Sequence, residues 1–333
     1  MPGPERYRIA MGGWIAAAWC LGVSPVAAQL YDDAALQADA ARYEERFNFL
    51  LERGLRDFLT AEERGAVEGV TVIHPLRGAG PLAFKFAPVA GEAPTIVAPA
   101  ATLKFVEDLS VVYAWRYLQR QSLEPIDEYL AMLKHRADKF GAATSDPLSA
   151  LGVPSRVWES NKAVDDLSLR FRNSAWAFLL AHELGHLRLG HLEKPRSAHE
   201  SQQREAEADA FAVDVLARSG TIPMGAVLWL QASAGYMRNR SDFDSDAAYE
   251  AWLRDDASHP VNGTRMRHLA SAMRDQARQA ADANSAETLE FIAVRLEAIG
   301  EIVEDPEIQA YLRHCADVRR AEELSRADDR PCK

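Results

Sequence analysis

A histidine-rich motif ends an apolar stretch near the middle of the 333-residue chain. His182 and His186 stand four residues apart, and Glu183 directly follows the first of them. On a helix, residues four apart lie on one face with Cβ atoms about 5–6 Å apart, so both imidazoles can bind one metal ion. An apolar helix carries such groups only where a partner offsets the cost of removing them from water, and a divalent metal is the usual partner. The motif therefore predicts one Zn²⁺ ion bound by His182 and His186.

Glu183 is expected to be the general base of the reaction and not a metal ligand. In helices of this kind, the glutamate after the first histidine reaches a water held at the metal. Zinc lowers the pKa of that water towards about 7, and Glu183 would take its proton during attack on a carbonyl carbon and return it to the leaving amine. The spacing alone is no proof, because an ordinary helix face also meets these offsets by chance.

A catalytic zinc needs a third protein ligand and keeps one open position. Glu205 and Asp209 stand one turn apart on a predicted helix over residues 204–218. We expect Glu205 to bind the metal, and Asp209 to accept a hydrogen bond from a ligand imidazole, which orients the ring and raises its basicity. Glu207 is expected to point elsewhere. A solvated acidic helix face is the alternative for the pair.

These motifs together resemble a known group of enzymes. The matching segments are His182-Glu183-Leu184-Gly185-His186 with His191 five residues on, Glu205-x-x-Ala208-Asp209-Ala210, Ser258-His259-Pro260 and Thr264-Arg265-Met266-x-x-Leu269. They resemble the HtpX, BepA and type I CAAX prenyl protease group of zinc metallopeptidases, over roughly residues 170–270.

The resemblance implies a gluzincin-type fold in which His182, His186 and Glu205 bind zinc and Glu183 is the catalytic base. It also places His259 near the active site, where it would stabilise the transition state or gate the metal; a residue of a helix N-terminal turn is the alternative. His191 is expected to be structural and to hydrogen-bond the helix end. The implied substrates are unfolded or misassembled envelope proteins. Membrane-bound members of the group carry transmembrane helices, so the soluble periplasmic members are expected to be nearer relatives.

The N-terminal segment has the pattern of a cleaved signal peptide. Arg6 and Arg8 precede an apolar run over residues 9–23, and small residues lead to a cleavage site after Ala28. A membrane anchor is the alternative, although the run is shorter than the roughly 20 residues that span a bilayer. No later segment has such a run, so we expect a periplasmic or secreted protein without a membrane span in the mature chain.

The three cysteines suggest export but no metal site. Cys20 could mark a lipoprotein, but Trp19 stands where a small residue is expected. Cys315 and Cys332 either bridge in an oxidising compartment or remain free thiols. Neither is close in sequence to the histidine motif.

Composition narrows the classes of partner. The chain is 48% hydrophobic and 26% charged, which suits a globular protein with one sizeable core and appendages, or with two modest domains. Its formal net charge is -11, without a long lysine or arginine run, so nucleic acid and anionic membranes are not expected as partners. Protein or peptide substrates fit better, and the oligomeric state stays open.

Periodicity predicts an α+β, mostly helical fold with a small β-sheet. Helices are expected over residues 33–59, 103–121, 126–140, 165 to the histidine motif, 204–218, and in segments after 247 that break at His259-Pro260, Asn284 and Asp305-Pro306. About three short strands are expected between residues 67 and 99, with a substrate-binding edge strand at 94–98. The predicted domains are a signal peptide (1–28), an N-terminal amphipathic helix (29–65), a zinc metallopeptidase domain (66–282) and a C-terminal helical extension (283–333).

The leading hypothesis is a zinc-dependent endopeptidase. One rival is a chaperone-like or regulatory binding protein in which zinc is structural and His259 is its fourth ligand, so that no position is left for water. Another is an enzyme that hydrolyses something other than protein. Spacing encodes neither the cleavage specificity nor whether the site is active or latent.

Overall fold

The computed structural model describes residues 30–87, 93–140, 145–191, 195–255, 257, 259–325 and 332. Most of them are helical, which confirms the predicted mostly helical α+β class. The predicted signal peptide and Ser258 lie outside the described residues. Within the described part, no helix is long and apolar enough to cross a membrane.

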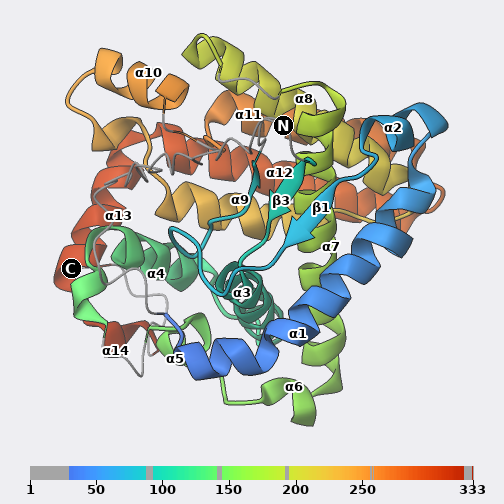
Figure 1. Ribbon diagram of the computed structural model, residues 1–333. Helices are drawn as coiled ribbons and strands as arrows, with labels where there is room; N and C mark the ends of the chain where they lie inside the picture. Colours follow the sequence, from blue (N-terminus) through green and yellow to red (C-terminus); the bar gives the residue numbers. More distant parts are fainter. Residues whose placement is uncertain are drawn as a thin grey trace, which may run out of the picture.

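The helices make up most of the described chain, and the three strands lie between α2 and α3 (Figure 1). The helices are α1 (Asp33–Phe49), α2 (Ala61–Ala66), α3 (Ala100–Leu118), α4 (Glu124–His135), α5 (Pro147–Ala150), α6 (Val157–Ser160), α7 (Lys162–Arg188), α8 (Ala198–Arg218), α9 (Met224–Tyr236), α10 (Asp246–Asp255), α11 (Gly263–Gln279), α12 (Ala283–Glu304), α13 (Pro306–Val318) and α14 (Ala321–Leu324). A π-helical segment (Leu50–Leu55) and a 3₁₀ turn (Arg56–Phe58) continue α1 to the end of the predicted helix.

The sheet has three short strands: β1 (Thr71–Ile73), β2 (Lys85–Ala87) and β3 (Thr95–Val97). Their order is β1-β3-β2, with β1 parallel and β2 antiparallel to β3. The prediction of an edge strand at residues 94–98 is wrong, because β3 pairs on both sides and has no free edge. Alternation along a strand shows which side chains face the core, but it does not give the strand's place in the sheet. The strand that packs against α7 is β2.

Helix α7 carries the histidine motif and packs against elements from both halves of the chain (Figure 1). Its 27 residues extend about 40 Å at 1.5 Å per residue. Every residue from Ser174 to Leu187 is buried, and the helix packs against α3, α8 and α9. At the crossing with α9, a Cβ on Gly225 would lie 2.2 Å from the backbone N of Ala175, so only glycine permits this approach. The apolar stretch of the sequence is therefore a helix enclosed by its neighbours.

Two predicted helix boundaries are wrong because polar side chains cap the helices earlier. Helix α8 begins at Ala198 instead of residue 204, since the Ser197 side chain accepts a hydrogen bond from the backbone N–H of Glu200. Helix α12 begins at Ala283, where Asp282 caps it, so the expected break at Asn284 lies inside the helix.

The C-terminal helices pack on the rest of the chain. Helix α12 packs against α11 and α9, and α13 packs against α4. Cys315 of α13 forms a disulfide with Cys332, so the two cysteines are bridged and not free thiols.

A partly buried carboxylate joins three helices. Glu107 of α3 accepts hydrogen bonds from Arg42 of α1 at 2.9 and 2.8 Å and from Arg172 of α7 at 2.7 Å. The Tyr43 hydroxyl donates a further bond at 2.7 Å. Burial alone would raise the pKa of Glu107, but the hydrogen bonds and charges of the two arginines lower it to about 2.

Replacing Glu107→Gln should therefore weaken the fold in a pH-dependent way. A pKa near 2 in the folded state, against 4.5 ordinarily, contributes stability that is fully present above about pH 4.5 and lost as the pH falls towards 2. At pH 7 we expect the free energy of unfolding to fall by about 3 kcal/mol. Urea denaturation at pH 7 and pH 3 measures this.

The matched control is Glu301→Gln on α12, which removes an exposed carboxylate. It should leave the free energy of unfolding within about 0.5 kcal/mol of the wild type at both pH values. A deficit of Glu107→Gln that is the same at pH 3 as at pH 7 would contradict the assigned role of its charge.

Candidate metal centre

The histidine motif lies in the last two turns of α7, against α8. Nε2 of His182 and Nε2 of His186 are 3.1 Å apart. The carboxylate of Glu205, from α8, brings Oε2 to 3.5 Å from Nε2 of His182 and Oε1 to 3.3 Å from Nε2 of His186. The three side chains named as metal ligands from the sequence thus meet at one point.

This spacing fits a tetrahedral metal ion. Ligand atoms about 2.1 Å from Zn²⁺ lie about 3.4 Å from one another in a tetrahedron. The three separations between the ligand atoms, 3.1, 3.3 and 3.5 Å, lie around that value. His182, His186, Glu205 and His259 form a group whose possible ligand atoms all lie within 4.8 Å of one another.

The other ring nitrogen of each ligand histidine has its own partner. Nδ1 of His182 is 2.9 Å from Oδ1 of Asp209, as expected for the carboxylate that orients this ring. Nδ1 of His186 is 3.0 Å from Nδ1 of His191, whose Nε2 is 3.1 Å from Oε2 of Glu207. If each Nδ1–H of the two ligand histidines donates outward, both Nε2 atoms present lone pairs to the same point.

His191 and Glu207 therefore take part in the centre. The backbone N–H of His191 donates to the carbonyl of His186, which confirms the predicted bond to the helix end. Glu207 is exposed and does point away from the ligand atoms, as predicted, but its carboxylate contacts the ring of His191. The contact between Glu207 and His191 was not predicted, because it depends on how α8 packs against the end of α7.

Arg265 is a residue of the centre to which the sequence assigned no role. From the first turn of α11, its Nε donates to Asp209 at 2.7 Å and its Nη2 donates to the same carboxylate at 2.9 Å. Its Nη1 lies 2.9 Å from Oε2 of Glu205. The sequence did contain a signal for this role. Two acids expected to be buried, Glu205 and Asp209, need a cation nearby, and an arginine stands in the motif that follows His259.

His259 lies directly over the ligands. Its Nδ1 is 3.3 Å from Nε2 of His182 and 3.1 Å from Oε2 of Glu205, and its Nε2 is 3.2 Å from Oε1 of Glu183. It is not the cap of the following helix, because the side chain of Asn262 caps α11. Sequence placed His259 near the centre only by resemblance, and the structure brings it into contact with the base and two ligands.

The charges of the centre call for a divalent cation. Glu183, Glu205 and Asp209 carry three negative charges, Arg265 carries one positive charge, and all four are at most 4% exposed. Burial opposes ionisation of Glu205, yet the charges of His259 and Arg265 hold its pKa well below its usual range. Without a metal, burial disfavours a charged His259, but the carboxylates of Glu205 and Glu183 raise its pKa to about 10. A divalent ion would balance the two remaining negative charges with all imidazoles neutral.

A glycine sets the distance between α7 and α8 here. A Cβ on Gly185 would lie 3.1 Å from Cα and 3.2 Å from the carbonyl O of Ala208. The small residue at each position lets α8 approach closely enough for Glu205 to reach the imidazoles. This explains why glycine stands between the two histidines.

Comparison with known families supports a peptidase. Residues 158–224 match the family model of Peptidase U49. The matched segment includes all of α7 and α8, and therefore His182, His186 and Glu205. The match indicates a peptidase family and hydrolase activity, but it does not single out the HtpX, BepA and CAAX protease group. Neither the curated proteins nor the solved structures yield a significant match.

Substitution of Arg265→Gln should reduce zinc affinity at least tenfold. It leaves Asp209 and Glu205 without their guanidinium, and loss of a group that supports metal ligands typically costs 10–100-fold in affinity. Competition with a chromogenic chelator measures the Kd. Arg265→Lys keeps the positive charge but loses the bidentate contact with Asp209, so its zinc affinity should lie between those of the wild type and Arg265→Gln. Wild-type affinity in a folded Arg265→Gln protein would refute the role.

A larger side chain at position 185, where α7 contacts α8, should weaken metal binding only by increasing the distance between the two helices. Gly185→Val pushes α8 away from α7, so we expect a loss of zinc while both histidines remain in place. Metal content after dialysis, by elemental analysis, provides the measurement. Gly65→Ala is the control, since nothing lies within 4 Å of a Cβ there; equal zinc content in both variants would contradict the packing argument.

Proposed function

We propose that this protein is a zinc-dependent endopeptidase. His182, His186 and Glu205 would bind a single ion, with Asp209 and Arg265 holding His182 and Glu205 in place. The observation that carries the proposal is the meeting of two Nε2 atoms and one carboxylate at tetrahedral spacing, inside the segment that matches a peptidase family. Its substrates would be unfolded or misassembled proteins.

Zinc at this position would supply Lewis-acid chemistry by polarising a carbonyl and lowering the pKa of water. The side chain of Glu183 follows His182 and faces the same point from α7, with its Oε1 3.2 Å from Nε2 of His259. Glu183 would accept the proton of the attacking water and return it to the leaving amine. His259 would donate a hydrogen bond from Nε2, which holds the Glu183 carboxylate in position until substrate enters.

A second candidate is a zinc-stabilised binding protein with a closed or latent site. The observation that favours it is the position of His259, whose Nδ1 lies as close to His182 and Glu205 as these ligands lie to each other. The side chains nearest the expected ion are also buried, with His186 and His259 the most exposed at 8% each. A fourth protein ligand would leave no position for water.

The proposed substrate class and location are supported by sequence patterns alone. The N-terminal pattern favours export to the periplasm or out of the cell, and the family resemblance implies envelope proteins as substrates. Protein or peptide substrates also fit the negative net charge better than nucleic acid.

The test is cleavage of an unfolded protein by the zinc-loaded mature chain, beside Glu183→Gln with its zinc content measured. We expect the variant to keep zinc and lose at least about 99% of the turnover, because the proton acceptor is absent while the ligands remain. His186→Ala should lose both zinc and activity. Cleavage by Glu183→Gln at the wild-type rate would refute the assignment of the base.

A third variant separates the two candidate functions. If the wild type binds zinc but does not cut, His259→Ala should start to cut when the site is a latent peptidase. Continued inactivity of His259→Ala, with zinc retained, would favour the binding protein.

A further inference from the structure

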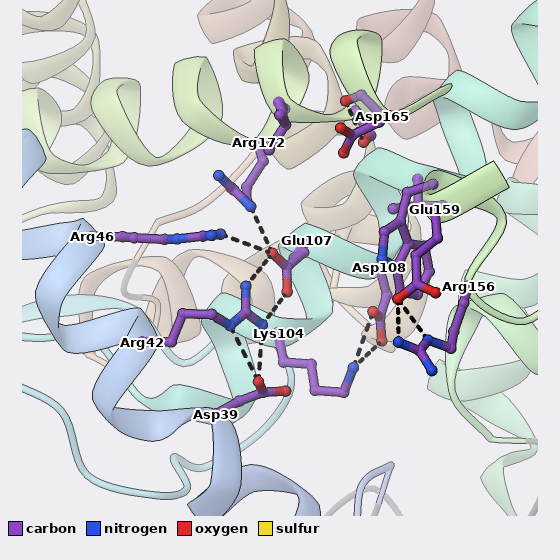
Figure 2. Close-up of a pocket in the computed structure, with 14 residues that line it drawn as sticks. Asp39, Arg42, Arg46, Lys104, Glu107, Asp108, Arg156, Glu159, Asp165 and Arg172 are labelled. Carbon is purple, nitrogen blue, oxygen red and sulfur yellow. Dashed lines mark hydrogen bonds and ion pairs between the residues drawn. The ribbon is translucent and has the colours of Figure 1, made fainter. Parts of the chain in front are cut away.

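A polar cleft of about 540 Å³ lies away from the histidine centre, between α1, α3, α6 and the first half of α7 (Figure 2). Asp165, on its wall, precedes His182 by 17 residues of α7, about 25 Å along the helix axis. The volume lies in the range of about 300–1,000 Å³ usual for small-molecule sites. Nothing in the proposed chemistry uses this cleft.

The cleft has a basic end. Figure 2 shows Arg42, Arg46 and Arg172 directed at Glu107. The Glu107 carboxylate is already satisfied by Arg42, Arg172 and the Tyr43 hydroxyl, at 2.7–2.9 Å. Arg46 approaches it only to 3.9 Å, and its side chain is 44% exposed. Arg46 is therefore a cation that can turn to a bound anion without breaking a close ion pair.

The opposite end is acidic. Asp165, Asp108 and Glu159 line it together with Lys104 and Arg156. Lys104 binds Asp108, and Arg156 binds Glu159, so both cations are paired. Among the described residues, no hydrogen bond or ion pair reaches the Asp165 carboxylate. Its neighbour Lys162 is instead bonded to Asp166.

The lining thus carries one surplus positive charge at one end and one surplus negative charge at the other. Three arginines face Asp39 and Glu107 at the basic end, while three acids face two cations at the acidic end. Apolar side chains complete the wall: Val111, Trp158 and Leu169. A ligand that matches this surface has a carboxylate at one end, an ammonium at the other and an apolar middle.

The length of the cleft selects the size of that ligand. Asp165 and Arg172 are seven residues apart on α7, which is two turns and about 10 Å. Arg172 marks the basic end, because it donates to the same oxygen of Glu107, Oε1, that Arg46 approaches. An extended peptide advances about 3.3–3.6 Å per residue, so three residues reach about 10 Å. A single amino acid is too short to meet both ends.

We infer that this cleft binds a short peptide, about three residues long, with both termini free. The peptide carboxylate would bind Arg46, its ammonium would bind Asp165, and an apolar side chain would lie against Trp158. Such peptides are products of peptide hydrolysis, so the inference extends the proposed function. Binding itself does not require that function.

Isothermal titration with the tripeptide Ala-Leu-Ala tests the inference. The protein is the mature chain carrying Glu183→Gln, so that the peptide cannot be consumed, and the wild type is titrated alongside. We expect saturable binding of one peptide per chain. The N-acetylated peptide and the C-terminal amide should each bind at least about tenfold more weakly, because each lacks one charge.

Single substitutions test which residue binds each end of the peptide. Arg46→Gln should weaken Ala-Leu-Ala about tenfold and remove the discrimination against the amide, while discrimination against the acetylated peptide remains. Asp165→Asn should give the reverse pattern. The matched controls are Arg53→Gln and Asp166→Asn, exposed residues on the same helical segments that do not line the cleft.

Several outcomes would overturn the inference. Absence of saturable binding in the millimolar range would show that the charges serve only to join the helices. Equal binding of the free and the acetylated peptide would indicate a simple anion site. If the peptide binds as expected but neither wild type nor Glu183→Gln cuts protein, the proposed peptidase function fails while the peptide site stands.

Discussion

The structure depends on balancing negative charge that is buried at the junction of α7, α8 and the start of α11. Three carboxylates lie there with almost no access to water, and only one guanidinium, that of Arg265, is permanently positive beside them. Such a group is stable only with additional positive charge, supplied by a protonated imidazole or by a divalent ion. Because the imidazoles direct two Nε2 atoms at one point, the ion is the better solution.

Helix α7 carries two kinds of surface on one rigid element. Its second half is apolar and enclosed, so it can hold titratable groups at fixed distances, and close contacts at Gly225 and Gly185 set how near α9 and α8 approach. Its first half is polar, and Arg172 joins it to Glu107 of α3 and thereby to α1. The elements that hold the metal centre are thus tied to the elements that line the peptide cleft.

The candidate metal centre and the polar cleft lie towards opposite ends of α7. The histidine centre is nearly closed, with His259 in contact with both the base and the ligands, whereas the cleft at the other end of α7 is open to solvent and is lined by charges of both signs. A site closed in this way must open before a polypeptide can enter. A surface that recognises free peptide termini favours what remains after hydrolysis over the intact chain.

Periodicity and spacing were enough to predict the mostly helical class and three short strands, and they named His182, His186 and Glu205, which the structure brings to one point. Helical repeats place residues four apart on one face regardless of the rest of the fold. That these three residues bind a metal stays a prediction. The helix starts at Ala198 and Ala283 were missed because capping by Ser197 and Asp282 is a local contact that competes with the apolar pattern. Contacts between distant segments were beyond such reasoning. The central place of β3, the approach of Arg265 to Asp209 and of Glu207 to His191, and the position of His259 depend on how the chain returns on itself, which only tertiary packing decides.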